Sequence, residues 1–178
     1  DPLNMAPTAS TTAMMAAGDA LAAVLMKLHA FTKDEYAVFH PGGVLGQKLL
    51  CRVDELMHTG EALPVVKEGA KLQDALLEMT SKRLGGAFIL DAENKLTGIL
   101  TDGDLRRILQ LQREKDPLRL PVRDVMTTAP HRIRAEMLAV DALREMETFL
   151  ITMLPVMDER GQLAGALHIH DLIRAGIQ

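Results

Sequence analysis

Several features that mark particular classes of protein are missing from the 178-residue chain. Its one cysteine, Cys51, cannot form an internal disulfide, which fits a reducing compartment, so we expect a cytoplasmic location. The net charge of −4 provides no basic face for a phosphate backbone, so we expect no nucleic-acid partner. No apolar run approaches the ~20 residues that cross a bilayer, and we expect no membrane partner. Tryptophan is absent, and the 11 methionines indicate a core of aliphatic and flexible side chains.

One structural unit is present twice in the sequence. Three blocks of the first copy return in the same order in the second, first 69 and then 67 positions later: 53–57 as 122–126, 74–79 as 141–146, and 95–105 as 162–172. The common order, with a single two-residue deletion between blocks, indicates an internal repeat.

Each copy shows the same alternation of helical and strand periodicity. In the first copy we expect a helix over Lys71–Lys82, strands over Gly86–Leu90 and Leu96–Leu100, and a helix through Leu105, Ile108 and Leu109. In the second copy we expect a helix over Leu138–Thr148, strands over Met153–Met157 and Leu163–His168, and a helix over Ile169–Ala175. Each unit is therefore strand, helix, strand, strand, helix, in the α/β (α+β) class. Neither copy could bury both faces of its sheet alone, so we expect the two to pack together.

The first fifty residues differ from the repeats. A strongly helical stretch, Ala13–Leu28, is apolar on most sides and has few possible partners within the chain. A tight loop follows at His40-Pro41-Gly42-Gly43. The chain also begins at Asp1 without an initiator methionine, and we expect residues 1–50 to be the end of a domain whose body lies upstream.

A possible ligand motif, Thr101-x-x-Asp104, stands where a strand meets a helix. A helix amino terminus favours an anion, and the Thr101 hydroxyl could add a hydrogen bond to a phosphate. The Asp104 carboxylate could accept hydrogen bonds from the two hydroxyls of a ribose, and Gly103 would allow a close backbone approach. The same pattern is also an ordinary capping arrangement, and both readings stay open on these residues alone.

The order of the blocks, with the run 98–105 as its sharpest part, resembles a tandem pair of CBS domains, which bind adenosine or other nucleotides between the copies. This resemblance implies domains at 53–112 and 122–176, joined by a linker at 113–121. It assigns phosphate contact to Thr101 and ribose contact to Asp104. In the second copy Asp171 matches, but His168 stands in place of the threonine, so we expect one dominant site.

The front segment resembles the end of the sugar-isomerase (SIS) domain of D-arabinose 5-phosphate isomerases, which carry a SIS domain followed by a CBS pair; the similar stretches are 6–12, 18–21 and 40–46. The resemblance implies a parent enzyme that interconverts D-ribulose 5-phosphate and D-arabinose 5-phosphate for Kdo and lipopolysaccharide biosynthesis. It gives His40 a role in the active site of that full-length enzyme. The other catalytic groups would lie upstream, so we expect the 178-residue chain alone to be inactive.

The resemblance also implies a regulatory ligand and an assembly. CMP or CMP-Kdo is the expected nucleotide because the pathway produces CMP-Kdo, and AMP or ATP is the alternative. Either Arg106 or Arg107 could reach an anionic ligand, and we place Arg106 in the site. His168, His170 and Asp171 have the wrong spacing for a metal site, so we expect none. We expect a homo-oligomer, with CBS pairs that dimerise and a tetrameric parent; in the alternative, the pair is only a dimerisation module.

Overall fold

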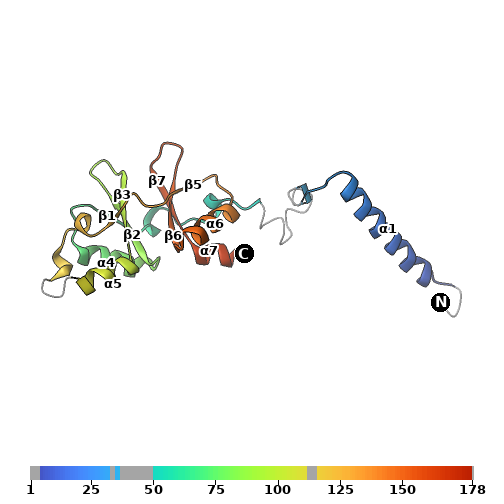
Figure 1. The fold of residues 1–178 in the computed structure, drawn as a ribbon, viewed down its shortest axis with the longest axis horizontal. Coiled ribbons are helices and arrows are strands. Elements are labelled where there is room, and N and C mark those ends of the chain that lie inside the picture. The colour runs from blue at the N-terminus through green and yellow to red at the C-terminus, as the bar shows by residue number, and fades with distance from the viewer. Residues whose placement is uncertain (1–4, 33–34, 37–49, 112–115, 178) are drawn as a thin grey trace. The chain divides into compact units, whose positions relative to one another are not determined.

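The structure is a computed structural model that describes residues 5–32, 35–36, 50–111 and 116–177 (Figure 1). The chain divides into two compact units, 1–46 and 47–178, and each is described by itself. The predicted His40 lies outside the described residues.

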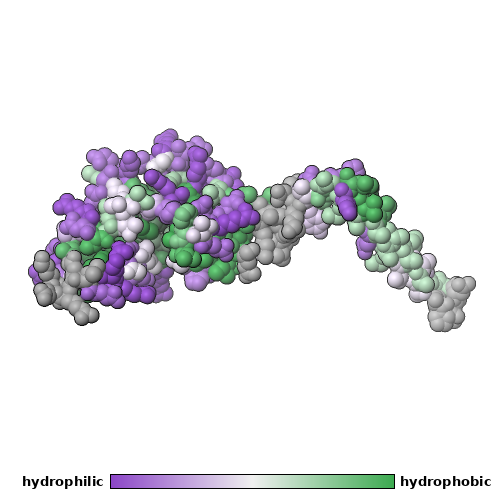
Figure 2. Space-filling model, in the orientation of Figure 1, coloured by the Kyte–Doolittle hydropathy of each residue, from purple (hydrophilic) through white to green (hydrophobic). Residues whose placement is uncertain are grey.

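The first unit contains helix α1, Thr8–Leu28, which begins five residues before the expected start at Ala13. The hydroxyl groups of Thr11 and Thr12 donate to the carbonyls of Pro7 and Thr8, one turn back, so the hydroxyl-rich segment continues the helix. Hydrophobic side chains run along α1 (Figure 2), and none of its residues is buried.

The expectation that no apolar run approaches the length of a membrane span is wrong for α1. Its 21 residues are long and apolar enough to cross a bilayer by length and composition, and an 18-residue window within it has a mean hydropathy of 1.3. The five additional residues at its start supply the missing length. A core helix of a soluble protein meets the same criterion, so the finding is weak evidence for a membrane.

The second unit begins with the sheet of the first repeat, in the order β1 (Val65–Lys67), β2 (Gly86–Leu90), β3 (Leu96–Thr101) and β4 (Thr127–Thr128). Helix α4 (Leu72–Lys82) connects the parallel strands β1 and β2, and α5 (Asp102–Leu111) follows β3 directly. The predicted helices and strands of this copy are confirmed.

The second repeat has the same construction. Its sheet has the order β5 (Ile133–Arg134), β6 (Met153–Met157) and β7 (Leu163–His168), with helices α6 (Ala139–Phe149) and α7 (Ile169–Arg174). The hairpin turns also match: Asn94 and Gly161 are left-handed at equivalent positions, with φ of 65° and 74°. The predicted elements of this copy are confirmed to within one or two residues.

Three hydrophobic clusters explain why the central strands are buried on both faces. Along β2, Ala87 and Ile89 pack with the helices of the first copy, whereas Phe88 faces the other way. Phe88 shares a cluster with Met153 and Met157 of β6. Each sheet is thus covered by its own helices on one face and by the other copy on the opposite face, as expected from the repeat.

The leading segments of the two copies are exchanged in space. Val53 is fully buried in the core of the second copy, where its amide donates to the Met137 carbonyl at 2.9 Å. Val122 is fully buried in the core of the first copy, where its amide donates to the Ala70 carbonyl at 2.9 Å. This exchange brings β4, at the start of the second repeat, next to β3 of the first.

Candidate ligand-binding cleft between the repeats

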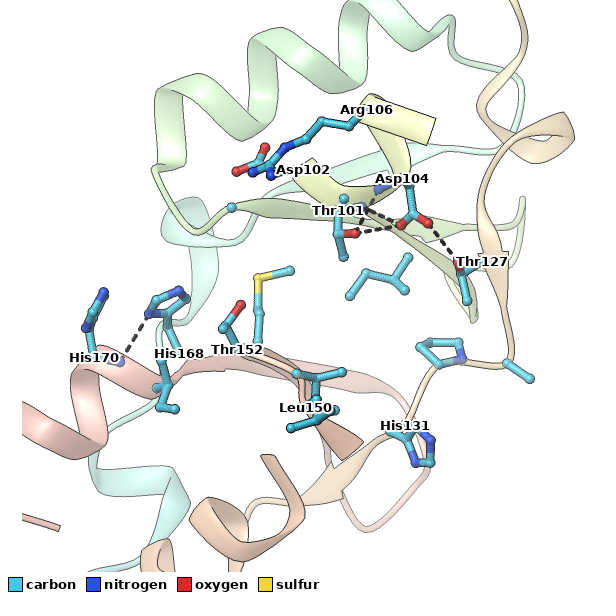
Figure 3. A pocket seen from close by; sticks show the side chains of 18 residues that line it. Thr101, Asp102, Asp104, Arg106, Thr127, His131, Leu150, Thr152, His168 and His170 are labelled. Atoms are coloured by element: carbon cyan, nitrogen blue, oxygen red, sulfur yellow. Dashed lines mark hydrogen bonds between the residues drawn. The ribbon is translucent and has the colours of Figure 1, made fainter. Parts of the chain in front are cut away.

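A cleft of about 720 Å³ lies between the two copies (Figure 3). Its volume falls within the ~300–1,000 Å³ that small-molecule sites occupy. Five of the predicted site residues line it: Thr101, Gly103, Asp104, Arg106 and His168. Asp171 is not among the lining residues.

Asp104 is the organising residue of the upper wall in Figure 3. Within the part of the chain that the structure describes, it is the one charged residue that is buried, with 6% of the whole residue exposed. Its Oδ2 accepts hydrogen bonds from the amide of Thr101 at 2.9 Å and from the Thr101 hydroxyl at 2.7 Å. Its Oδ1 accepts from Arg107 at 2.7 Å and from the Thr127 hydroxyl at 3.2 Å.

The capping arrangement weighed from the sequence is therefore present. The Thr101 hydroxyl also accepts from the amide of Asp104 at 3.3 Å, which closes the cap at the start of α5. A cap does not exclude a ligand site, because Thr101, Gly103 and Asp104 all line the cleft beside the first turn of the helix. The cap fixes the carboxylate and the hydroxyl in position before any ligand arrives.

Two partners of Asp104 were not predicted from the sequence: Arg107 was named only as a possible ligand contact, and Thr127 was missed. Arg107 pairs with the Asp104 carboxylate, whereas Arg106 lines the cleft, which answers how the two arginines divide their roles. Thr127 comes from the leading segment of the second repeat and reaches Asp104 because that segment packs on the first copy. The signal available for Arg107 was its repeat equivalent Arg174, at the same distance from Asp171.

The second copy holds a matching but different cluster. Asp171 Oδ2 accepts from the amide of His168 at 3.2 Å and contacts His58 Nε2 at 2.9 Å. Arg174 lies 3.9 Å from Asp171 Oδ1. His58 and His168 thus occupy the places that Thr127 and Thr101 hold in the first copy.

The histidines of this cluster have a distinct environment. His168 Nδ1 accepts from the amide of His170 at 3.2 Å, which caps α7. Partial burial, followed by the neighbouring His170, lowers the pKa of His168 below its ordinary value, and the Asp171 carboxylate opposes that shift. His168 is therefore held mainly in its neutral form at pH 7.

The opposite end of the cleft is more apolar. Ala129, Pro130 and Leu150 line it together with His131, whose ring stacks on Phe149 at a centroid distance of 3.7 Å. Sequence reasoning did not find these residues because they lie in loops outside the repeated blocks. Figure 3 shows His131 at this end and His168 and His170 at the other.

This fold and cleft define a tandem pair of CBS domains. The CBS domain family matches residues 53–111 and 122–177, and the chain belongs to that family. The chain is 50% identical over 176 residues to "Arabinose 5-phosphate isomerase KdsD" of Escherichia coli O6:H1, covering 99% of this chain. It spans about half (53%) of the length of that relative.

Solved structures agree with this assignment. CBSX2 of Arabidopsis thaliana, solved in complex with AMP, has a TM-score of 0.61 and 30% identity over 70% of this chain and 95% of that one. The CBS domain protein PAE2072 of Pyrobaculum aerophilum, also complexed with AMP, has a TM-score of 0.60 and 22% identity over 68% of this chain and 89% of that one. The second likeness supports the fold alone.

Proposed function

We propose that this chain is the nucleotide-sensing regulatory part of an arabinose 5-phosphate isomerase. The observation that carries the proposal is the capped Thr101–Asp104 pair at the wall of a cleft built from both repeats. The extensive identity to arabinose 5-phosphate isomerase KdsD supports the parent activity, the interconversion of D-ribulose 5-phosphate and D-arabinose 5-phosphate in the Kdo branch of lipopolysaccharide biosynthesis.

The geometry supports one orientation for a nucleotide in the cleft. The ribose hydroxyls would donate to Asp104 Oδ1, in place of the Thr127 hydroxyl or of Arg107. The first phosphate would lie at the Thr101 hydroxyl and the first turn of α5, where helix amides favour an anion. The base would then occupy the apolar end beside Pro130 and His131.

The ligand we favour is CMP or CMP-Kdo, with AMP or ATP as the competitor. The complex of CBSX2 with AMP supports a nucleotide in general. Around Gly103 there is open space for a ligand, since a Cβ at that position would lie 3.6 Å from the Thr101 hydroxyl, an ordinary contact distance.

The remaining parts of the proposal concern the chain outside the cleft. Residues 1–50 would be the end of the SIS domain, and the apolar α1 would pack in that domain. His40 would serve the active site of the full-length enzyme only, so the 178-residue chain would be inactive. We further propose domains at 53–112 and 122–176, a cytoplasmic location, CBS pairs that dimerise and a tetrameric parent.

Isothermal titration calorimetry on the 178-residue chain with CMP, CMP-Kdo, AMP and ATP tests the sensor. We expect one of them to bind with Kd well below 1 mM, a threshold that corresponds to only about 4 kcal/mol. If none binds, and if deletion of residues 53–178 from the full enzyme changes only its oligomeric state, the pair is a dimerisation module and the sensor proposal is wrong.

A further inference from the structure

The ligand cleft does not end at the first repeat's phosphate position. A second cleft of about 440 Å³ continues from it, and the two share Gly85, Asp102, His168 and His170 in their walls. A nucleotide held at Asp104, with its phosphate at Thr101, would therefore extend toward the two histidines. Figure 3 shows His168 and His170 at the end of the cleft where Arg106 and Asp102 also lie.

The fixed charges around this junction largely cancel, so the histidines determine the net charge there. Arg107 neutralises Asp104 through its 2.7 Å contact, and Asp102 and Arg106 carry opposite charges in the same wall. Arg83 adds one positive charge from the continuing cleft. The net charge that a ligand meets beyond its first phosphate therefore depends on whether His168 is protonated.

The cap of α7 also fixes how His168 can act. Its Nδ1 accepts the hydrogen bond from the His170 amide, so the neutral ring carries its proton on Nε2. The rings of His168 and His170 have centroids 5.0 Å apart, close enough for both to meet one anionic group. His168 thus offers its Nε2–H donor when neutral. When protonated it gains a positive charge, and Nδ1 then carries a proton and no longer accepts from the His170 amide.

We propose that His168 and His170 are specificity residues that bind a second anionic group of the regulatory nucleotide, either a further phosphate or the carboxylate of an attached sugar acid. This inference rests on the proposed nucleotide function and sharpens it. It gives the departure from threonine at position 168 a role, because an imidazole, unlike a hydroxyl, can take up a proton when an anion lies against it.

Binding of that second group is coupled to protonation. Several neighbours face His168: His170, His58 and Arg174 oppose its protonation, while Asp171 favours it. Asp102 shares its wall of the cleft, as does Arg83 of the continuing cleft. An anion placed against His168 favours the imidazolium, so a ligand with the second group should bind more tightly as the pH falls toward 6.

Calorimetry with CMP, CDP and CMP-Kdo on the 178-residue chain tests this inference. At about pH 6 we expect CDP or CMP-Kdo to bind at least tenfold more tightly than CMP, a difference of about 1.4 kcal/mol. The preference should shrink at about pH 8. Tighter binding of CDP would show that a phosphate is favoured, and tighter binding of CMP-Kdo would show that a carboxylate is favoured.

The decisive variant is His168→Asn with His170→Gln, because asparagine also caps a helix well and position 170 is exposed. We expect the double variant to bind CMP as before and to lose the preference, whereas the control His29→Gln, an exposed histidine that lines neither cleft, keeps it. An unchanged preference in the double variant, or no preference in the unsubstituted chain, overturns the inference and leaves the nucleotide function standing. Failure of every nucleotide to bind overturns the proposed function itself.

Discussion

Removal of the Asp104 carboxylate is the sharpest test of the site. The side chain is 8% exposed and accepts hydrogen bonds from Thr101, Arg107 and Thr127. Loss of the cap in Asp104→Ala costs about 1 kcal/mol, and the hydrogen bond from Thr127 is worth another ~1 kcal/mol. Because the Arg107 side chain is 59% exposed, its ion pair adds only ~0–1 kcal/mol.

The expected loss of stability is therefore about 2–3 kcal/mol, a fall in Tm of about 4–12 °C for a chain of this size. Affinity should fall for a separate reason. Hydrogen bonds to a charged group contribute ~1.5–3 kcal/mol, so the dissociation constants of CMP and AMP should rise about 10- to 150-fold. Differential scanning calorimetry measures the first quantity and isothermal titration calorimetry, below the unfolding range, measures the second.

Asp171→Ala is the matched control, because Asp171 is 13% exposed and holds the equivalent place in the second copy without lining the cleft. It should reduce stability by a similar amount and leave the affinity for CMP within about twofold, less than 0.5 kcal/mol. Equal losses of affinity in both variants would mean that the binding change reports damage to the fold. Unchanged affinity in Asp104→Ala would place the ribose elsewhere.

Three further predictions concern the fold around the cleft. A Cβ at Gly98 would lie 2.4 Å from the sulfur of Met126, so Gly98→Ala should lower the free energy of unfolding in urea by ~1–3 kcal/mol. A Cβ at Gly69 would have nothing within 4 Å, so the control Gly69→Ala should change the free energy of unfolding little. Phe88→Ala removes a fully buried ring between the sheets and should cost ~3–5 kcal/mol in thermal unfolding; separate transitions for the two copies would contradict the shared core. The lowered pKa of His168 means that the unfolded chain binds more protons, so stability should fall as the pH drops below about 6.5. Urea unfolding at pH 7.5 and 5.5 should show a smaller fall in His168→Asn, and an equal fall would assign the effect to other groups.

The repeated elements could be predicted because their periodicity and packing agree. Gly86–Leu90 and Met153–Met157 are continuous apolar runs whose two faces pack into different clusters, and each strand was expected at the limits observed. The start of α1 was missed because threonine has a weak helix preference, whereas in the structure Thr11 and Thr12 lie within the helix.

The site was only partly predictable for a topological reason. Thr101 and Asp104 are near neighbours in sequence, so their spacing alone could predict that they pair. Thr127 reaches Asp104 across 23 positions, and His58 reaches Asp171 across 113, only because the leading segments of the repeats are exchanged. No local pattern records that exchange, and it follows only from the packing of Val53 and Val122.

The exchange of the leading segments also determines how far the surroundings of Asp104 and Asp171 can differ. Each ligand-side carboxylate is held by a residue from its own copy and by one from the leading segment of the other repeat, so a substitution in either segment changes the opposite site. His58 next to Asp171, and His168 in place of a threonine, put titratable groups on both sides of one carboxylate. Thr127 and Thr101 leave the other carboxylate among neutral hydroxyls and one arginine. The two copies therefore keep the same backbone frame and differ in four side chains, with two threonines beside Asp104 and two histidines beside Asp171.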